Sequence, residues 1–403
     1  MKADLLRRPA FWLALSAFFL PIKPAPVNLF LLVAVLLVLG QSEYRGHIVQ
    51  ALRRPDVTWL CVFTLGLLAT YAMPDTDQAA YFDFVHKYGR FLLVPLLVPA
   101  LYRNEDRGMV LRAFLSSMGL TLLLSWLIWA GANPAWFGVH ADSEYGIPAN
   151  PTVYKLHITQ NFFMVIAIFY WLQAALDLKD TKPAWSVVYG LVVVFALINV
   201  FGMVQGRTGW IVFAVIPVVF FARRMGLKGL IAGLVFSVAV LALSYLLVGN
   251  VHERVDKGVS EVLALYHGGQ TDTSMGERYT YMLAGWSAFL DAPWIGHGVG
   301  GVVKAVSAFS LQRGVEPFAN PHNQFLLILI QSGLVGLFAY LLLLGLQFRQ
   351  AIQSKIGARY IVPLMGMYVI GNALNSFHYD FAESMLFIYM TAAVGLPPEP
   401  SNV

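Results

Sequence analysis

Residues 321–347 read PHNQFLLILIQSGLVGLFAYLLLLGLQ and contain no Asp, Glu, Lys or Arg. An apolar stretch of roughly 20 residues is long enough to cross a bilayer as a single helix. The apolar side chains follow one another without the alternation of period 2 that marks a transmembrane β-strand. This stretch therefore predicts a membrane-spanning helix, and it sets the expectation for the rest of the chain.

Similar apolar stretches recur along most of the 403 residues. Hydrophobic residues make up 58% of the chain and charged residues 12%, whereas charged residues make up about 25% of a soluble domain. Twelve candidate spans follow, at 9–22, 26–41, 57–74, 83–102, 109–131, 153–176, 184–205, 209–223, 229–249, 321–347, 360–377 and 382–397. The sequence therefore predicts an all-α fold, a polytopic transmembrane helical bundle of about twelve helices.

The basic residues indicate how these spans are oriented. If the N-terminus lies in the cytoplasm, the inner ends and loops hold Lys2, Arg7, Arg8, Arg45, Arg53, Arg54, Arg103, Arg107, Lys179, Lys182, Arg223, Arg224, Lys228, Arg349, Lys355 and Arg359. The outer loops hold Lys23 and Arg207 and little else that is basic, and the outer stretch 75–80 carries only acidic charge. Because Lys and Arg are enriched in cytoplasmic loops, we expect both termini on the cytoplasmic side.

Two longer segments, residues 132–152 and 250–320, interrupt the pattern of short loops, and both fall on the outer side. An unstructured loop as long as the second segment is uncommon in a compact protein, so we expect it to fold in part. The chain then divides into nine transmembrane helices in residues 1–249, an outer segment with an amphipathic helix in 250–320, and three transmembrane helices in 321–403.

The amphipathic helix is predicted from a capping pattern and a periodicity. Ser274-Met275-Gly276-Glu277 has the spacing of a capping box, which opens a helix. Apolar residues then recur at helical spacing, at Met275, Tyr279, Met282, Trp286 and Phe289. Asp291-Ala292-Pro293 ends the pattern. We expect this helix to lie at the membrane surface.

Two arginines stand on the outer side, where basic residues are otherwise sparse. Arg207 lies in the tight outer turn 205–210, at the mouth of the predicted bundle. It either belongs to a functional site or snorkels to a lipid headgroup. Arg278 borders the apolar stripe of the amphipathic helix, three residues after Met275 and four before Met282. It either reaches a phosphate at headgroup depth or forms a weak ion pair in water.

His322 is the candidate for a catalytic base. Asn320 suits the N-cap of the following helix, and Pro321 suits its first position. His322 then falls in the first turn, where the positive end of the helix dipole disfavours the imidazolium form. A neutral imidazole near pH 7 is able to accept a proton. The alternative is a histidine that only satisfies loop carbonyls.

A weaker group of charged residues lies near two other outer turns. His86, Lys87 and Arg90 begin the span 83–102, and Lys87 and Arg90 share a helix face. These two cations either line a cavity for an anionic substrate or snorkel. Asp380 and Glu383 either orient a base, balance these cations or lie in a solvated turn. We give no role to His378.

Several kinds of site have no signature in the sequence. It contains no phosphate-binding Walker A loop, no HExxH zinc motif, no carboxylate cluster for a metal and no nucleic-acid-binding motif. The glycines of 296–301 follow a predicted helix instead of a strand, which argues against a dinucleotide site. The single cysteine, Cys61, excludes a disulfide framework. We therefore expect no metal, no cofactor and no nucleic acid.

The motifs taken in order resemble one family of membrane enzymes. Asn320-Pro321-His322-Asn323-Gln324-Phe325-Leu326, followed by Gly333-Leu334-Val335-Gly336, resembles the His-Asn and Gly-x-x-Gly pattern of the O-antigen ligase and polymerase superfamily. Gly206-Arg207-Thr208-Gly209-Trp210 resembles its Arg-Thr/Ser-Gly motif. Arg278 with Trp286, Pro293 and Gly296-His297-Gly298 resembles the segment before the His motif. The order of these motifs and the long outer loop extend the resemblance over most of the chain.

The resemblance implies an activity, with His322 as its base and Arg207 and Arg278 as diphosphate binders. Members of the superfamily transfer a glycan from undecaprenyl diphosphate to an acceptor hydroxyl at the periplasmic face of the inner membrane. In a ligase the acceptor is the lipid A–core oligosaccharide. A second lipid-linked glycan in a polymerase, or a protein in a protein O-oligosaccharyltransferase, is the alternative acceptor. A transporter of lipid-linked saccharide is the alternative from a different class.

Overall fold

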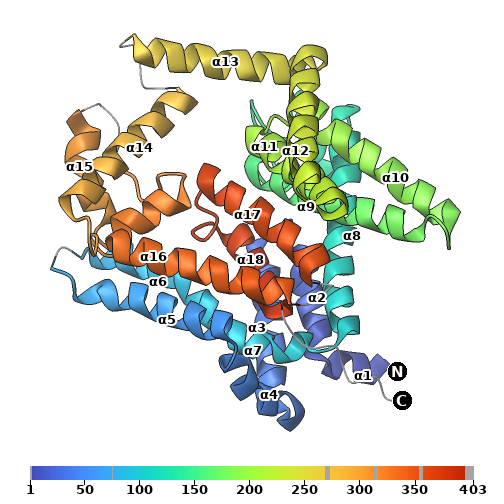
Figure 1. Ribbon diagram of the computed structural model, residues 1–403, viewed down its shortest axis with the longest axis horizontal. Coiled ribbons are helices and arrows are strands. Elements are labelled where there is room, and N and C mark those ends of the chain that lie inside the picture. The colour runs from blue at the N-terminus through green and yellow to red at the C-terminus, as the bar shows by residue number, and fades with distance from the viewer. Residues whose placement is uncertain (1, 75, 268–272, 313–315, 354–356, 395–403) are drawn as a thin grey trace.

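A computed structural model describes residues 2–74, 76–267, 273–312, 316–353 and 357–394, and these residues contain helices and no β-strand (Figure 1). The first helices are α1 (Lys2–Arg7), α2 (Pro9–Phe19), α3 (Pro24–Gly40), α4 (Ser42–Leu52), α5 (Pro55–Ala69), α6 (Gln78–Tyr88), α7 (Val94–Leu97), α8 (Asn104–Trp129) and α9 (His157–Leu178). Then follow α10 (Pro183–Ile198), α11 (Arg207–Phe213), α12 (Val215–Leu247), α13 (Gly249–Tyr266), α14 (Ser274–Asp291), α15 (Val302–Gln312), α16 (Gln324–Ile352), α17 (Val362–Leu374) and α18 (Phe381–Ala393). The predicted all-α class is confirmed.

Six helical segments are long and apolar enough to cross a membrane. They are Pro55–Ala72, Asn104–Trp129, His157–Leu178, Pro183–Met203, Arg207–Leu247 and Gln324–Ile352. The bent pair α3 and α4, at 99° to each other, brings the number to seven if it forms one span. The polytopic prediction is confirmed, but the helices at several of the twelve predicted spans are too short or too broken to meet this criterion. Asp75, Lys355 and residues 395–397 of the last predicted span lie outside the described residues.

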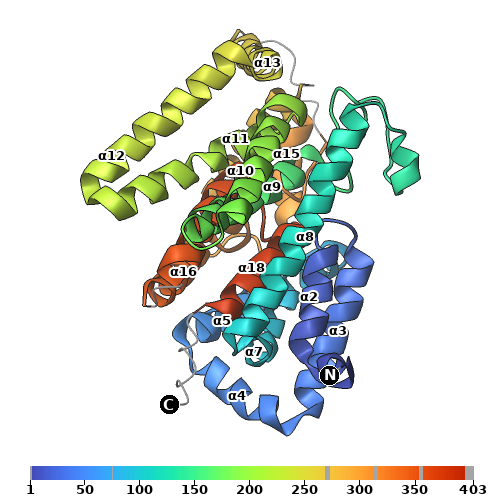
Figure 2. The same ribbon diagram turned by 90° about the vertical axis from the view of Figure 1, so that its right-hand side faces the viewer.

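The predicted spans 209–223 and 229–249 are joined into a hairpin at Gly226, which has a φ of 59° (Figure 2). A glycine adopts this left-handed conformation without steric cost. Gly229 and Gly233 let the two arms pack closely. A Cβ at Gly233 would lie 2.5 Å from Cα of Val218 on the first arm. Small residues therefore hold the hairpin together, as they do between many membrane helices.

The predicted span 83–102 is instead a series of short pieces. The helix α6 ends at Tyr88, and two 3₁₀ segments, Gly89–Leu93 and Pro99–Leu101, flank the four-residue α7. Pro95 and Pro99 lack the N–H that an α-helix interior requires, and their rings clash with the preceding turn. One continuous helix is therefore disfavoured in this stretch.

The helix α16 is broken at Gly333, and the loop after α14 fills the break. Gly333 has a φ of 60°. The N–H groups of Leu334 and Val335, freed by the break, donate to the carbonyls of Pro293 at 2.8 Å and Trp294 at 3.1 Å. On the other side of the break, the carbonyls of Ile330 and Gln331 accept from the N–H groups of His297 and Gly298, both at 2.9 Å. The broken helix therefore keeps its backbone groups paired, as the low polarity of a bilayer requires.

The outer segment 250–320 is more helical than the sequence predicted. The predicted amphipathic helix is α14, and it ends at Asp291 as expected. Its N-cap is Thr273, one residue before the predicted Ser274, and the side chain of Thr273 accepts a hydrogen bond from the N–H of Gly276 at 3.1 Å. The two further helices, α13 and α15, were not predicted. In both views α13 lies at the end of the molecule opposite α4 (Figures 1 and 2).

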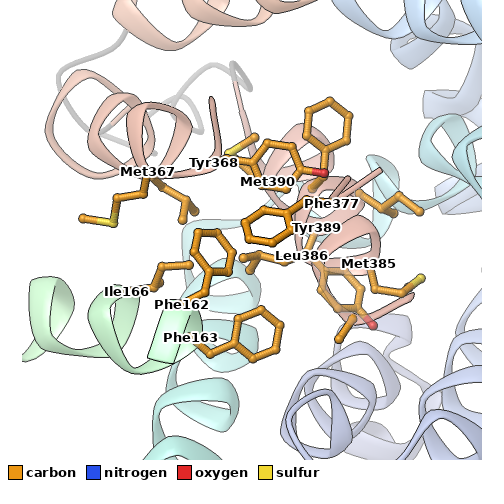
Figure 3. Packing of buried hydrophobic residues seen from close by; sticks show 14 of the residues in the cluster. Phe162, Phe163, Ile166, Met367, Tyr368, Phe377, Met385, Leu386, Tyr389 and Met390 are labelled. Atoms are coloured by element: carbon orange, nitrogen blue, oxygen red, sulfur yellow. The ribbon is translucent and has the colours of Figure 1, made fainter. Parts of the chain in front are cut away.

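A packed core holds α9, α17 and α18 together (Figure 3). The rings of Phe162 and Phe377 lie 4.5 Å apart, and Tyr368 packs against Phe377 and Phe387. All four side chains are fully buried or nearly so. Close packing of this kind leaves side chains little freedom to shift, so it fixes where the ends of these helices lie.

Candidate functional site

Arg207, Arg278 and His322 meet at one polar cavity of about 560 Å³. The three side chains come from distant parts of the chain, at the start of α11, in the first turns of α14 and just before α16. Other polar residues that line the cavity are Glu144, His157, Gln205, Arg254, Lys257, Glu261 and Glu277. The structure therefore brings together the three residues that the motifs singled out.

His322 does not lie in a helix, which corrects the sequence prediction. The N-cap of α16 is Asn323, whose Oδ1 accepts a hydrogen bond from the N–H of Leu326 at 3.0 Å, and the helix begins at Gln324. His322 has a φ of 53°, and its N–H donates to Oδ1 of Asn320 at 2.9 Å. A left-handed conformation is uncommon for a residue with a side chain, and such residues cluster at functional sites.

The predicted neutral state of His322 has a different cause from the one expected. Burial lowers the pKa of His322 most, and the positive charge of Arg278 lowers it further. Both effects disfavour the imidazolium form. The helix dipole, on which the sequence argument relied, does not account for this shift, because His322 precedes the helix. A hydrogen bond that the side chain of Asn375 accepts from the ring acts in the opposite direction and raises the pKa.

Asn375 connects His322 to the turn that carries Arg207. Its Nδ2 donates to Oγ1 of Thr208 at 3.3 Å, and its backbone carbonyl accepts from the N–H of Gln324 at 3.2 Å. Since its contact with His322 raises the pKa of the ring, Asn375 accepts there through Oδ1. Asn375 is 1% exposed, so little water competes for these contacts. The sequence analysis missed this residue, which lies near the end of a predicted apolar span and belongs to no motif.

The turn before α11 packs tightly on α9, and this contact places Arg207. A Cβ at Gly206 would lie 2.5 Å from Nδ2 of Asn161, and one at Gly209 would lie 2.6 Å from Cβ of Asn161. Nδ2 of Asn161 donates to the carbonyls of Val204 at 3.1 Å and Gly206 at 3.3 Å. The glycines on both sides of Arg207 are therefore required for this close approach.

Arg278 lies on the border between polar and apolar surfaces, as the spacing predicted. It lines the polar cavity and also an apolar pocket of about 360 Å³ formed by Met275, Tyr279 and Met282. Burial lowers the pKa of its guanidinium. His322 also lines both cavities.

The apolar surface continues along α14 and α16 beyond that pocket. A further pocket of about 360 Å³ lies between Tyr279, Met282 and Trp286 on one side and Phe325 and Leu326 on the other. Met282 is 54% exposed and Trp286 51% exposed, which is unusual for side chains of this size unless they face lipid or a ligand. An apolar track therefore leads from the side of the protein to Arg278.

Lys87 and Arg90 are not among the residues that line this cavity. Nζ of Lys87 pairs with Asp83 at 2.6 Å and lies 3.5 Å from the ring centre of Tyr379. Nη1 of Arg90 donates to the carbonyl of Phe381 at 3.4 Å. Both cations pack against the turn between α17 and α18, so the structure does not bring them together with Arg207, Arg278 and His322, and a role for them in binding an anionic substrate stays a prediction.

The two carboxylates near that turn differ in exposure. Asp380 is partly exposed and lies close to Lys87 and Arg90, and burial raises the pKa of its carboxyl. Glu383 is 2% exposed, and the positive charge that acts on it is that of Lys155. The structure therefore supports the reading that Asp380 balances these cations, and it contradicts a solvated position for Glu383. His378 is 1% exposed, with Nδ1 at 3.1 Å from the hydroxyl of Tyr368.

The cavity also contains residues that no motif indicated, in particular Arg254 and Glu261 on α13 and His157 at the start of α9. Oε2 of Glu261 accepts from the N–H of Met275 at 3.2 Å and joins α13 to α14. The ring of His157 stacks on Tyr145 with centres 5.5 Å apart. A helical spacing of valines at 251, 255 and 262 would have revealed α13 in the sequence.

Comparisons with known proteins agree with the motifs. Residues 191–341 match the family model described as O-antigen ligase, and this region carries Arg207, Arg278 and His322. An uncharacterized protein of Haemophilus influenzae is 25% identical over 172 residues, which is 40% of this chain and 43% of that protein. The chain thus spans less than half of the length of this curated relative. The resemblance is confirmed over residues 191–341, which match the O-antigen ligase family model and lie in a chain with several helices long and apolar enough to cross a membrane.

Proposed function

We propose that the protein is an O-antigen ligase that transfers a glycan from undecaprenyl diphosphate to the lipid A–core oligosaccharide. The observation that supports this most is the shared cavity of Arg207, Arg278 and His322, which continues into an apolar track. The reaction takes place at the periplasmic face of a bacterial inner membrane. The termini lie in the cytoplasm, in keeping with the basic inner loops.

The donor binds with its prenyl chain along the apolar track of Met282 and Trp286, where the hydrocarbon is removed from water. Its diphosphate lies between Arg207 and Arg278. Guanidinium groups donate two parallel hydrogen bonds to phosphate oxygens, and the partly buried site strengthens these charged contacts. The glycan then extends into the polar part of the cavity.

The transfer is a single displacement at the anomeric carbon. The acceptor hydroxyl attacks this carbon, and neutral His322 takes the hydroxyl proton. The bond between the anomeric carbon and the diphosphate oxygen breaks, and undecaprenyl diphosphate leaves with the electron pair. The anomeric configuration is inverted. Arg207 and Arg278 stabilise the charge that develops on the leaving group, so the proposal includes neither a metal nor a cofactor.

Asn375 has a positioning role in this reaction. A ring nitrogen of His322 that donates to Oδ1 of Asn375 carries the proton, which leaves the other ring nitrogen free to accept one. The contact of Asn375 with Thr208 ties the base to the turn of Arg207. His322 and Arg207 are thus held at a fixed distance from each other, which favours an efficient displacement.

A transfer assay with defined acceptors tests the proposal. Purified protein in proteoliposomes receives a lipid-linked glycan with the lipid A–core oligosaccharide, a second lipid-linked glycan or a pilin-like protein, and products are separated on gels. Glycan transfer to the core supports the ligase. Transfer only to the second donor or to protein identifies a polymerase or a protein O-oligosaccharyltransferase, and movement across the bilayer without transfer identifies a transporter. Loss of activity in chelator that a divalent ion restores would contradict the metal-independent mechanism.

A further inference from the structure

Arg254 lies at the same cavity as Arg207 and Arg278, although it belongs to none of the motifs. It comes from α13, and among the described residues no carboxylate forms an ion pair with it. Its Nε atom is enclosed by the protein and has no hydrogen-bond partner in the described part of the chain. A buried donor without a partner is unfavourable, so this geometry suits a ligand that supplies an acceptor.

The inner face of α13 is shaped to approach Arg207. Arg254, Gly258 and Glu261 follow at intervals of four and three residues, so they share one face of the helix. A Cβ at Gly258 would lie 2.6 Å from Nη1 of Arg207, so the guanidinium of Arg207 reaches α13 at this glycine. Glu261 fixes the far end of this face through its bond to the N–H of Met275.

Three guanidiniums around one cavity repel one another, and an anion relieves this repulsion. The charge of Arg254 acts on Arg207, and the charge of Arg278 acts on it as well. The negative charge that acts on Arg207 is that of Glu261, which already accepts a hydrogen bond from a backbone N–H. A diphosphate carries at least two negative charges and several acceptor oxygens, and it matches three convergent guanidiniums better than it matches two.

We propose that Arg254 is a third cation of the diphosphate site and that α13 is part of the donor-binding surface. This inference rests on the proposed function, since that function supplies the diphosphate. Arg254 binds the phosphate oxygens from the side opposite α14. The guanidinium of Arg207 lies against α13 at Gly258, one turn from Arg254, so both guanidiniums are near enough to reach one ligand.

Binding of undecaprenyl diphosphate without any glycan tests this assignment. The full chain in nanodiscs is titrated with this lipid, and affinity is followed by the fluorescence of a label on the protein. We expect Arg254→Gln to weaken binding by about tenfold or more, as is typical for hydrogen bonds to charged groups. Arg254→Lys keeps the positive charge but cannot donate two parallel hydrogen bonds to phosphate, so it should show a smaller loss of affinity. Thermal unfolding in the same nanodiscs reports whether each variant is folded.

Lys304→Gln is the matched control, because it removes one positive charge from α15 outside the cavity and should leave the affinity unchanged. Native affinity in both Arg254 variants overturns the inference. A loss seen only with a glycan-bearing donor also overturns it, because Arg254 would then contact the saccharide. Failure of the native protein to bind undecaprenyl diphosphate is a different result, since it contradicts the proposed function itself.

Discussion

Nδ2 of Asn375 donates a hydrogen bond to Oγ1 of Thr208 at 3.3 Å, although the two residues lie 167 positions apart in the chain. This contact joins the end of α17 to the start of α11. Thr208 follows Arg207, and the same Asn375 side chain hydrogen-bonds His322. One amide therefore links the proposed base to the turn that carries a proposed diphosphate binder.

Two substitutions of Asn375 should move the pH dependence of transfer in opposite directions. The hydrogen bond that Asn375 accepts from His322 raises the pKa of the ring. Asn375→Ala removes this contribution and lowers the pKa further. The acid limb of the pH–rate profile then moves to lower pH. Asn375→Asp places a carboxylate beside the ring, raises the pKa of His322 and moves the acid limb to higher pH. Profiles of kcat/KM measure both shifts, and a loss of rate without either shift would argue for a merely structural role.

Replacement of His322 should remove catalysis and spare donor binding. His322→Ala is expected to lower kcat by roughly 10²–10⁴-fold, the range typical of general-base catalysis. Because burial and Arg278 lower the pKa of His322, the native enzyme should keep its activity below the ordinary pKa of histidine and lose it as the ring becomes protonated. Single-turnover transfer with saturating donor measures the rate, and full turnover by His322→Ala excludes this role.

A polar substitution in the apolar track should discriminate between donors by the length of their prenyl chain. Met282 lines both apolar pockets. Met282→Gln is expected to raise KM for the undecaprenyl donor by about tenfold, because a buried amide without partners opposes the hydrocarbon. The KM for a donor whose short prenyl chain does not reach Met282 should change little. Equal effects on both donors would show that the chain follows another path.

An alanine at Gly333 should destabilise the protein, whereas an alanine at Gly345 should not. Gly333 has a φ of 60°, and a Cβ there would lie 2.4 Å from the carbonyl carbon of Trp294. Strain of this kind costs about 1–3 kcal/mol before the clash is counted. Gly345 lies in the same helix with nothing within 4 Å of its Cβ position, and alanine favours the helix there. Thermal unfolding of both variants in one detergent measures the difference.

Features that depend on residues close together in the sequence could be predicted from it. The polytopic helical class and six of the long helical segments followed from apolar length, and α14 followed from its capping residues and periodicity. Arg207 and Arg278 were singled out because positive charge is rare on the predicted outer side. The sequence placed His322 near the start of a helix, and the structure agrees. The predicted N-cap, Asn320, was wrong because Asn323 takes that role. Burial lowers the pKa of His322 most, and no spacing in the sequence reveals burial.

The features that escaped prediction depend on contacts between distant segments. The role of Asn375 depends on its hydrogen bonds to Thr208 and His322, which lie far from it in the sequence. Arg254 lies in a polar stretch that reads as a loop unless the valines of α13 are followed at helical spacing. Lys87 and Arg90 do not share one helix, since α6 ends at Tyr88 and Arg90 lies in the 3₁₀ segment that follows, and both side chains pack against the turn before α18.

The loop that fills the break of α16 has a mechanical consequence. Backbone hydrogen bonds on both sides of Gly333 attach the end of α14 to the middle of α16, and Gly285 of α14 lets Leu326 approach so closely that a Cβ would lie 2.9 Å away. The helices α14, which carries Arg278, and α16, which follows His322, are thus held together at two places along α16. When a thinner or thicker bilayer tilts α16, α14 tilts with it. The spacing between Arg278, the proposed diphosphate binder, and His322, the proposed base, should therefore change little with the lipid composition of the bilayer.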